Sequence, residues 1–225
     1  MSRIRKGLLF WLLFCLFVSC AFGSDNEITI SSKSGKNCSG TLQGGLRRIN
    51  ELAKDSKVED MWVFSEKTGM WYDVGENCEE NRFDAEFNVL RNRPNDISGT
   101  NLVNVHIHPK CNATENIDPP SPEDIESHFQ FVPEFRDKYK STWRSMVCDG
   151  HGVWEVTASD RVCNVMNRPY KKGDRERVLL VAALEDLSLF TAEEHWTIRS
   201  RQKVVKNFIT AAAKMGLQIT FKELQ

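Results

Sequence analysis

Two histidines separated by a single residue are the part of this sequence best suited to metal chemistry. His106 and His108 follow the apolar run Leu102-Val103-Asn104-Val105, and Pro109 comes directly after them. The run predicts a buried strand, and residues two apart on a strand point to the same face. Two neutral imidazoles and a carboxylate, with one position left to water, form the usual catalytic zinc site. The alternative is a strand end that carries two histidines with no shared role.

A carboxylate that could complete such a site follows in Pro120-Ser121-Pro122-Glu123-Asp124. This segment predicts the start of a helix, because serine caps free amides, proline suits the first helical position, and a carboxylate is favoured in the first turn. We expect the helix to reach His128 or slightly beyond. Ser121 and Asp124 could be helix caps alone, but the histidines upstream favour Asp124 as a ligand. His128 lies on the same helix face as Asp124, although a surface position is the more common role.

The remaining elements are predicted from the spacing of apolar residues and from turn residues. The pattern predicts a helix over 41–54, strands over 61–64 and 70–74, a loop over 75–81, a helix over 84–91, a turn-rich stretch over 93–100, strands over 143–148 and 152–157, a polar linker over 168–175, helices over 178–189 and 193–215, and a strand over 217–221. Helices and strands alternate throughout. The fold class is therefore α/β or α+β, with a mixed β-sheet flanked by helices and a C-terminal helical extension.

The two motifs and the order of the elements resemble the JAB1/MPN (JAMM) zinc metalloproteases, a family of deubiquitinating isopeptidases and bacterial peptidases. The resemblance covers roughly Leu42 to Ala158 and is carried by His-x-His-Pro, Pro-Ser-x-x-Asp and their order. It implies a JAB/MPN-like mixed sheet. It also implies that His106, His108 and Asp124 are the ligands of Zn²⁺ and that Ser121 steadies the tetrahedral oxygen. Barrel hydrolases that use His-x-His need a far longer chain.

The resemblance also implies a glutamate upstream that acts as general base. Glu59 stands at the corresponding point, before the strand that follows the first helix, and Glu66 at the far end of that strand is the alternative. Glu59 is the favoured residue. Zinc lowers the pKa of a bound water to about 7, and a carboxylate can pass the proton on to the leaving amine. Hydrolysis of an amide bond is therefore the expected reaction.

The sequence departs from the family pattern at three points. Ile107 replaces the usual serine or threonine, the stretch between His108 and Asp124 is longer and contains Cys111, and Met61-Trp62 stands where a glycine is usual. Cys111 could join a disulfide or compete as a thiolate ligand, and the disulfide is favoured in an oxidising compartment. These departures leave a second hypothesis open, a catalytically inactive JAMM-like binding or scaffold protein of the cell envelope.

The first 23 residues are typical of a signal peptide. A basic start is followed by the apolar segment 7–18 and by Ala21-Phe22-Gly23, so we expect cleavage after Gly23. The apolar segment is too short for a convincing membrane span. A lipoprotein signal that attaches lipid to Cys20 is the alternative. The protein is therefore expected to be secreted or periplasmic, with no integral membrane span in its mature form.

Length and charge limit the number of domains and the kinds of partner. The chain has 225 residues and a net charge of −1, with acidic and basic residues interspersed, which argues against nucleic acid or an anionic membrane as partner. A peptide or protein substrate is expected, and in a bacterial host the compartment favours a cell-envelope peptide or a secreted protein over ubiquitin. The residues after 23 suit one domain, divided into an N-terminal arm (24–40), a JAB/MPN-like domain (41–165) and an extension packed on it (166–225).

Export also bears on the cysteines, because exported proteins fold in a disulfide-permissive compartment. Five cysteines follow the predicted cleavage point, which would allow two disulfides and one odd thiol: Cys38, Cys78, Cys111, Cys148 and Cys163.

Overall fold

The computed structural model describes residues 37–79, 82–85, 87–108, 118–192 and 201–224. The expected signal peptide, Cys20 and most of the N-terminal arm lie outside these ranges, as do Pro109 and Cys111. Among the described helices, none combines the length and the apolar composition that crossing a bilayer requires.

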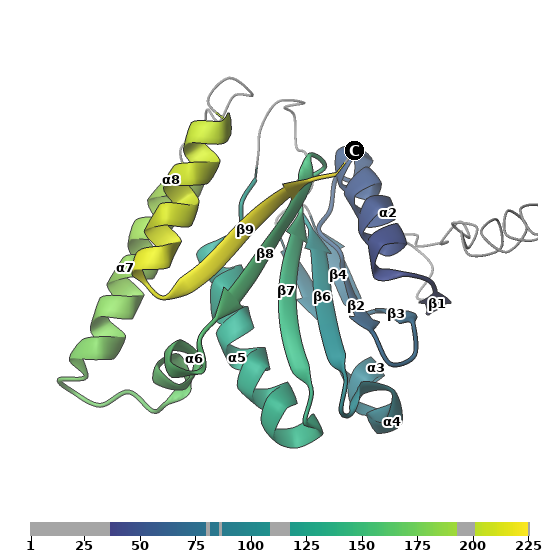
Figure 1. The fold of residues 1–225 in the computed structure, drawn as a ribbon, viewed down its shortest axis with the longest axis horizontal. Coiled ribbons are helices and arrows are strands. Elements are labelled where there is room, and N and C mark those ends of the chain that lie inside the picture. The colour runs from purple at the N-terminus through teal and green to yellow at the C-terminus, as the bar shows by residue number, and fades with distance from the viewer. Residues whose placement is uncertain (1–36, 80–81, 86, 109–117, 193–200, 225) are drawn as a thin grey trace, which may run out of the picture.

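A seven-stranded sheet forms the centre of the fold (Figure 1), which confirms the predicted mixed sheet flanked by helices. The strands, in their order across the sheet, are β1 (Cys38–Ser39), β3 (Met70–Asp73), β2 (Met61–Ser65), β6 (Asn101–Ile107), β7 (Thr142–Cys148), β8 (Gly152–Ala158) and β9 (Leu217–Glu223). Only β6 and β7 pair in parallel. A helix connects them, as parallel neighbours require.

Two helices pack near the middle of the sheet on its opposite faces, α2 (Leu42–Asp55) on β6 and β7 and α5 (Pro122–Tyr139) on β7 and β8 (Figure 1). α2 begins at Thr41, whose side chain accepts a hydrogen bond from Gly44 N, and its apolar face packs with Val103, Val105 and Ile107. α5 covers the other face, where Leu102 packs against Phe135. Successive residues of β6 thus face different helices, as the pleat of a strand dictates. The histidines of β6 therefore face α5.

α5 is longer than the sequence pattern predicts. It continues past His128 to Tyr139 although Pro133 lies inside it. Proline removes the hydrogen bond that residue 133 would donate to the carbonyl of Phe129. The side-chain amide of Asn167 donates to that carbonyl instead. Burial of Phe129, Phe135 and Tyr139 supports the helix on both sides of the proline.

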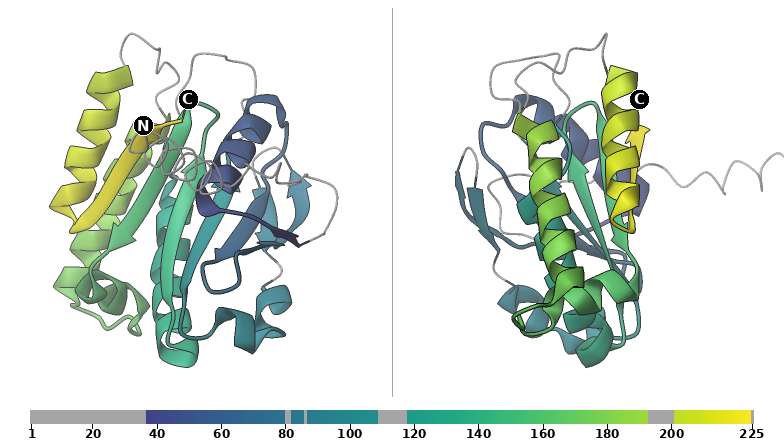
Figure 2. Two further views of the ribbon diagram at one scale, coloured as in Figure 1. Left: turned by 45° about the vertical axis from the view of Figure 1, so that its right-hand side comes forward. Right: turned by 90° about the vertical axis from the view of Figure 1, so that its left-hand side faces the viewer.

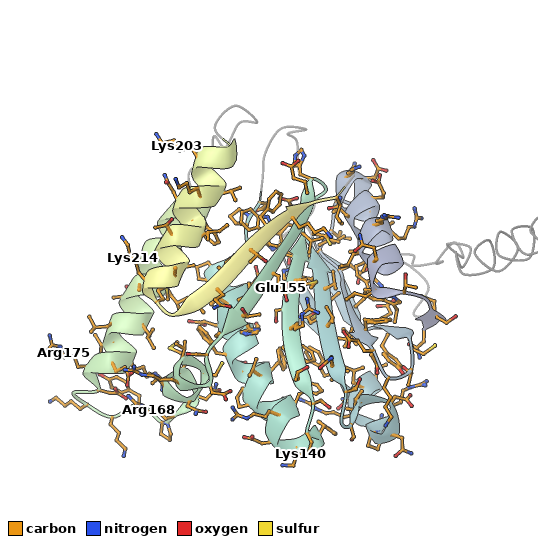
Figure 3. All side chains as sticks on the ribbon, viewed as in Figure 1. Lys140, Glu155, Arg168, Arg175, Lys203 and Lys214 are labelled. Carbon is orange, nitrogen blue, oxygen red and sulfur yellow. The ribbon has the colours of Figure 1, made fainter. Side chains whose placement is uncertain are left out.

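The C-terminal third packs on the same sheet. α6 (Asp160–Asn167), α7 (Arg175–Ala192) and α8 (Arg201–Lys214) precede β9, which pairs with β8 along its whole length. Leu184, Phe208 and Leu217 share one apolar cluster with Phe129 of α5. Figure 3 shows Arg175, Lys203 and Lys214 on the outer sides of α7 and α8, pointing away from the sheet. Leu184 and Leu187 of α7 and Phe208 of α8 are buried in the core, whereas Val178 and Leu179 of α7 are exposed.

Several predicted elements are wrong. The expected loop over 75–81 contains β4 (Gly75–Glu79), which pairs with β5 (Arg82–Ala85) in a separate two-stranded sheet that stands apart from the main sheet (Figure 2). The expected helix over 84–91 is reduced to α3 (Asn88–Arg91), and the turn-rich stretch contains α4 (Pro94–Ile97). α6 was not predicted. Of the helix expected over 193–215, residues 193–200 lie outside the described part.

The cysteines whose side chains are described, Cys38, Cys148 and Cys163, form no disulfide. The side chains of Cys78 and Cys111 lie outside the described part of the structure.

Candidate metal centre

The three predicted ligands meet at one point between β6 and α5. His106 Nε2 lies 3.2 Å from His108 Nε2. One oxygen of Asp124 lies 3.0 Å from His106 Nε2 and the other lies 3.2 Å from His108 Nε2. Ligand atoms bonded to one tetrahedral zinc at 2.0–2.1 Å lie roughly 3.3 Å from one another. The distances to Asp124 involve both of its oxygens, and one donor atom from each of the three residues lies within 4.8 Å of the other two, close enough to bind one ion.

The two histidines owe their common direction to β6. They lie two residues apart on the strand that is hydrogen-bonded to β2 on one side and to β7 on the other. His108 follows the last residue of the strand, and its backbone N–H donates to the carbonyl of Cys148 at 3.0 Å. Only 3 % of His106 and 6 % of His108 are exposed. Both rings are thus held in place in the interior.

Asp124 is positioned by the first turn of α5. Ser121 Oγ accepts a hydrogen bond from the backbone N–H of Asp124 at 3.2 Å, and Asp124 Oδ2 accepts one from the backbone N–H of Ser121 at 2.6 Å. This reciprocal pair is a capping box, which fixes the carboxylate at the positive end of the helix dipole. Ser121 is therefore a helix cap, and the same cap directs Asp124 towards the histidines.

The electrostatics of the cluster favour a positive charge at its centre. Burial alone would raise the pKa of Asp124, but His106 and His108 hold that pKa well below its usual range. Burial alone would lower the pKa of His108, but Asp118 and Asp124 raise it well above its usual range. Two ring nitrogens 3.2 Å apart also need a proton or a cation between them, because two lone pairs would repel. The three side chains form a candidate metal-binding site.

Glu59 lies near this cluster. The backbone N–H of Ile107 donates to the carbonyl of Asp60 at 3.1 Å, which places Glu59 beside the end of β6. Burial raises the pKa of the Glu59 carboxyl, His108 and His106 lower it, and Asp124 and Asp118 raise it further. The carboxyl thus lies within electrostatic reach of all three candidate ligands.

Glu66 lies at the opposite end of the same strand pair. Its Oε2 accepts a hydrogen bond of 2.6 Å from the side-chain amide of Asn101, and its backbone N–H donates to the carbonyl of Asn101. Five residues of extended chain separate Asn101 from His106, which is a distance of about 17 Å. The structure therefore brings Glu59, and not Glu66, to the histidines.

Asp118 is a site residue that the sequence analysis did not single out. Its Oδ2 lies 3.4 Å from His108 Nδ1, an ion-pair separation, and that nitrogen has no hydrogen bond within the described chain. The backbone N–H of Asp118 donates to Asp149 Oδ2 at 3.3 Å, and buried Asp149 also accepts from Trp154 Nε1. A carboxylate that accepts the second ring N–H of a ligating histidine fixes its tautomer and orientation, and a small movement of Asp118 would complete that hydrogen bond. A search of the sequence for a carboxylate near the ligands that could support a histidine would have found Asp118, which directly precedes Pro119-Pro120.

The surface position predicted for His128 is wrong. Only 1 % of the residue is exposed, and its Nδ1 lies 3.0 Å from Ser145 Oγ. Burial lowers its pKa to about 4, so the ring is neutral at pH 7. The ring is thus turned towards Ser145 on β7. Of the other histidines, His151 is half-buried in the turn between β7 and β8, and His195 lies outside the described residues.

Comparison of the chain with protein-family models, with curated proteins and with solved structures finds no match. The chemistry of the site is therefore argued from its own residues. Two buried imidazoles and one half-buried carboxylate, which converge, suit a divalent transition metal better than calcium or magnesium, which prefer oxygen ligands.

Proposed function

We propose that the protein is a zinc-dependent peptidase or isopeptidase of the JAMM type. The observation that carries the proposal is the convergence of His106, His108 and Asp124, with the Glu59 carboxyl within electrostatic reach of all three. Two histidines and a carboxylate leave one tetrahedral position for water, which is the arrangement of catalytic rather than structural zinc.

Each side chain has a separate task in this proposal. His106, His108 and Asp124 hold the metal, and Asp118 orients the ring of His108 from behind. Zinc in this position supplies Lewis-acid chemistry, because it acidifies water and polarises the scissile carbonyl. Glu59 takes a proton from the attacking water and returns it to the leaving amine. The raised pKa of Glu59 suits both steps, since a carboxyl with a pKa nearer neutrality accepts and returns a proton more readily.

Ser121 contributes a hydrogen-bond donor. Its Oγ uses one lone pair to accept from the N–H of Asp124, so the hydroxyl hydrogen remains available. We assign that hydrogen to the oxygen of the scissile carbonyl, where negative charge develops during attack. Because the expected signal peptide exports the chain, the proposed substrate is a cell-envelope peptide or a secreted protein.

The two glutamates test the proposal. Glu59→Gln should retain zinc and lose cleavage of internally quenched peptides by about 100-fold or more, because the amide cannot accept the proton. Glu66→Gln is the matched control, since the same change lies at the other end of the strand pair, and its cleavage rate should equal that of the wild type.

Two outcomes oppose this account. Cleavage that survives Glu59→Gln would exclude Glu59 as the base. A wild-type protein that binds zinc but cleaves nothing, with or without added metal, would favour the inactive scaffold hypothesis.

A further inference from the structure

A partly enclosed cavity of about 160 Å³ lies directly beside the candidate metal centre. His106 and Asp124, two of the three proposed ligands, form part of its wall. The cavity extends from them between the sheet and α5, and its other lining residues come from β2, β6, β7, β8, α5 and the residue before α3. Whatever occupies this space is held next to the metal.

Most of the cavity wall is apolar. Met61, Phe87, Phe131, Val147 and Val156 line it. The rings of Phe87 and Phe131 lie 4.5 Å apart and are tilted to each other, an arrangement that can receive a further aromatic ring edge to face. An apolar cavity of about 150 Å³ is large enough to hold benzene. The space therefore suits one aromatic ring.

Besides the two proposed ligands, three polar side chains interrupt the apolar wall: Ser127 of α5 and, on neighbouring strands, Asn104 and Ser145. Asn104 and Ser145 are register partners on β6 and β7, and 4 % and 6 % of them are exposed. Asn104 Oδ1 is buried and has no hydrogen-bond partner among the described residues. A half-turn of the amide exchanges its oxygen and nitrogen, so Asn104 can offer an acceptor or a donor.

Ser145 also has hydrogen-bonding capacity left. Its Oγ accepts from Trp143 Nε1 at 3.1 Å and lies 3.0 Å from His128 Nδ1. A hydroxyl has one donor and two acceptor positions, so two partners leave one position for a ligand. A buried amide without a partner costs free energy, which a ligand with a polar tip would recover.

We propose that this cavity binds the side chain of a tyrosine next to the scissile bond, an inference that rests on the proposed peptidase function. The phenol ring matches the apolar wall and the volume. Its hydroxyl both donates and accepts, so it can donate to Ser145 Oγ and accept from the amide nitrogen of Asn104. Phenylalanine would leave the buried amide unpaired. Lysine would bury a positive charge in the cavity. Asp124 is the one carboxylate among the described residues that line it, and Asp124 is already assigned to the metal.

The experiment uses p-cresol and toluene, the side chains of tyrosine and phenylalanine, titrated into the purified protein with and without zinc. Methyl NMR signals of Met61, Val147 and Val156 report occupancy of the cavity. We expect p-cresol to bind about tenfold more tightly than toluene, as one additional hydrogen bond in a buried site would give. Asn104→Leu keeps the size of the side chain and should reduce that preference, because it removes one of the two partners of the phenol hydroxyl. Ser145→Ala removes the other and should also reduce it, and Val156→Phe should fill the cavity and prevent binding of both probes.

Asn50→Leu is the matched control. Asn50 is an equally buried asparagine of α2, on the other face of the sheet, where its Oδ1 accepts from Gly150 N. The change should leave the preference for p-cresol intact. Equal binding of both probes to the wild type, binding of neither, or a preference that survives both Asn104→Leu and Ser145→Ala would overturn the proposal.

A peptide arm separates this inference from the proposed function. Peptides with tyrosine, phenylalanine or alanine on either side of one scissile bond should be cleaved fastest when tyrosine is present. Selective p-cresol binding without any zinc-dependent cleavage would overturn the peptidase and leave the cavity assignment standing. Zinc-dependent cleavage without p-cresol selectivity would overturn the cavity assignment and leave the peptidase function standing.

Discussion

Ser121 combines a structural role with the catalytic role proposed for it, and the two can be separated by substitution. Ser121→Gly should cost only a few tenths of a kcal/mol in stability, whereas Ser121→Ala should cost about 1 kcal/mol, because glycine is tolerated at this cap and alanine is not. Both variants lack the hydroxyl and should lose cleavage by about 100-fold. Thermal unfolding and peptide cleavage measured together check this. If Ser121→Gly cleaves peptides at nearly the wild-type rate and only the less stable Ser121→Ala is slower, Ser121 is a helix cap and has no catalytic role.

His128 should make the protein sensitive to mild acid. Its pKa is lowered by burial to about 4 in the folded state, against 6.5 for the ordinary histidine. The neutral ring thus contributes stability that is fully present above pH 6.5 and is lost as the pH falls towards 4. The loss is about 3 kcal/mol at most.

His128→Gln removes the titration but keeps a group that can hydrogen-bond Ser145. The stability difference between wild type and variant, from denaturant unfolding at pH 7 and pH 4, should change by about 2–3 kcal/mol. Comparing the two proteins at each pH cancels the titration of Asp124, which both share. A difference that is the same at both pH values would contradict the burial of a neutral His128.

At the scale of elements, α5 depends on a contact from α6. The amide of Asn167 donates to the Phe129 carbonyl that Pro133 leaves without a helical partner, and it also donates to Cys163 O at 2.8 Å. In the wild type, Asn167→Ala should cost about 1–2 kcal/mol. In a Pro133→Ala background the cost should be smaller by about 1 kcal/mol, because the new N–H serves that carbonyl. A double-mutant cycle by denaturant unfolding measures the coupling, and equal costs in both backgrounds would refute it.

Elements with local sequence signals could be predicted, and those that depend on distant contacts could not. β6 and the start of α5 were predictable because a buried apolar run and the sequence Ser121-Pro122 are local signals. The continuation of α5 was not predictable, because the partner of the Phe129 carbonyl lies 38 residues away. The hairpin of β4 and β5 was missed because Gly75-Glu76-Asn77 carries no alternation of apolar residues.

At the scale of the whole molecule, the candidate site is a product of sheet topology. Antiparallel pairing places Met61 opposite His106, so a glutamate 47 positions earlier in the sequence lies beside the histidines. The sequence could propose both Glu59 and Glu66, but only the register shows which end of the strand pair each one occupies. The position of Asp118 depends on a contact across 31 residues, because its backbone N–H donates to Asp149 in the turn between β7 and β8. The three candidate ligands could therefore be predicted from the sequence, whereas the positions of Glu59 and Asp118 beside them depend on contacts that only the fold shows.

The zinc content of the purified protein shows whether His106, His108 and Asp124 bind a metal. We expect about one zinc per wild-type chain and loss of most of that zinc in His106→Ala and in Asp124→Ala, because each change removes one of three ligands. His151→Ala removes a histidine outside the cluster and should retain the metal. If the wild-type protein binds no zinc, or if both ligand variants retain a full equivalent, the three residues do not form a zinc site.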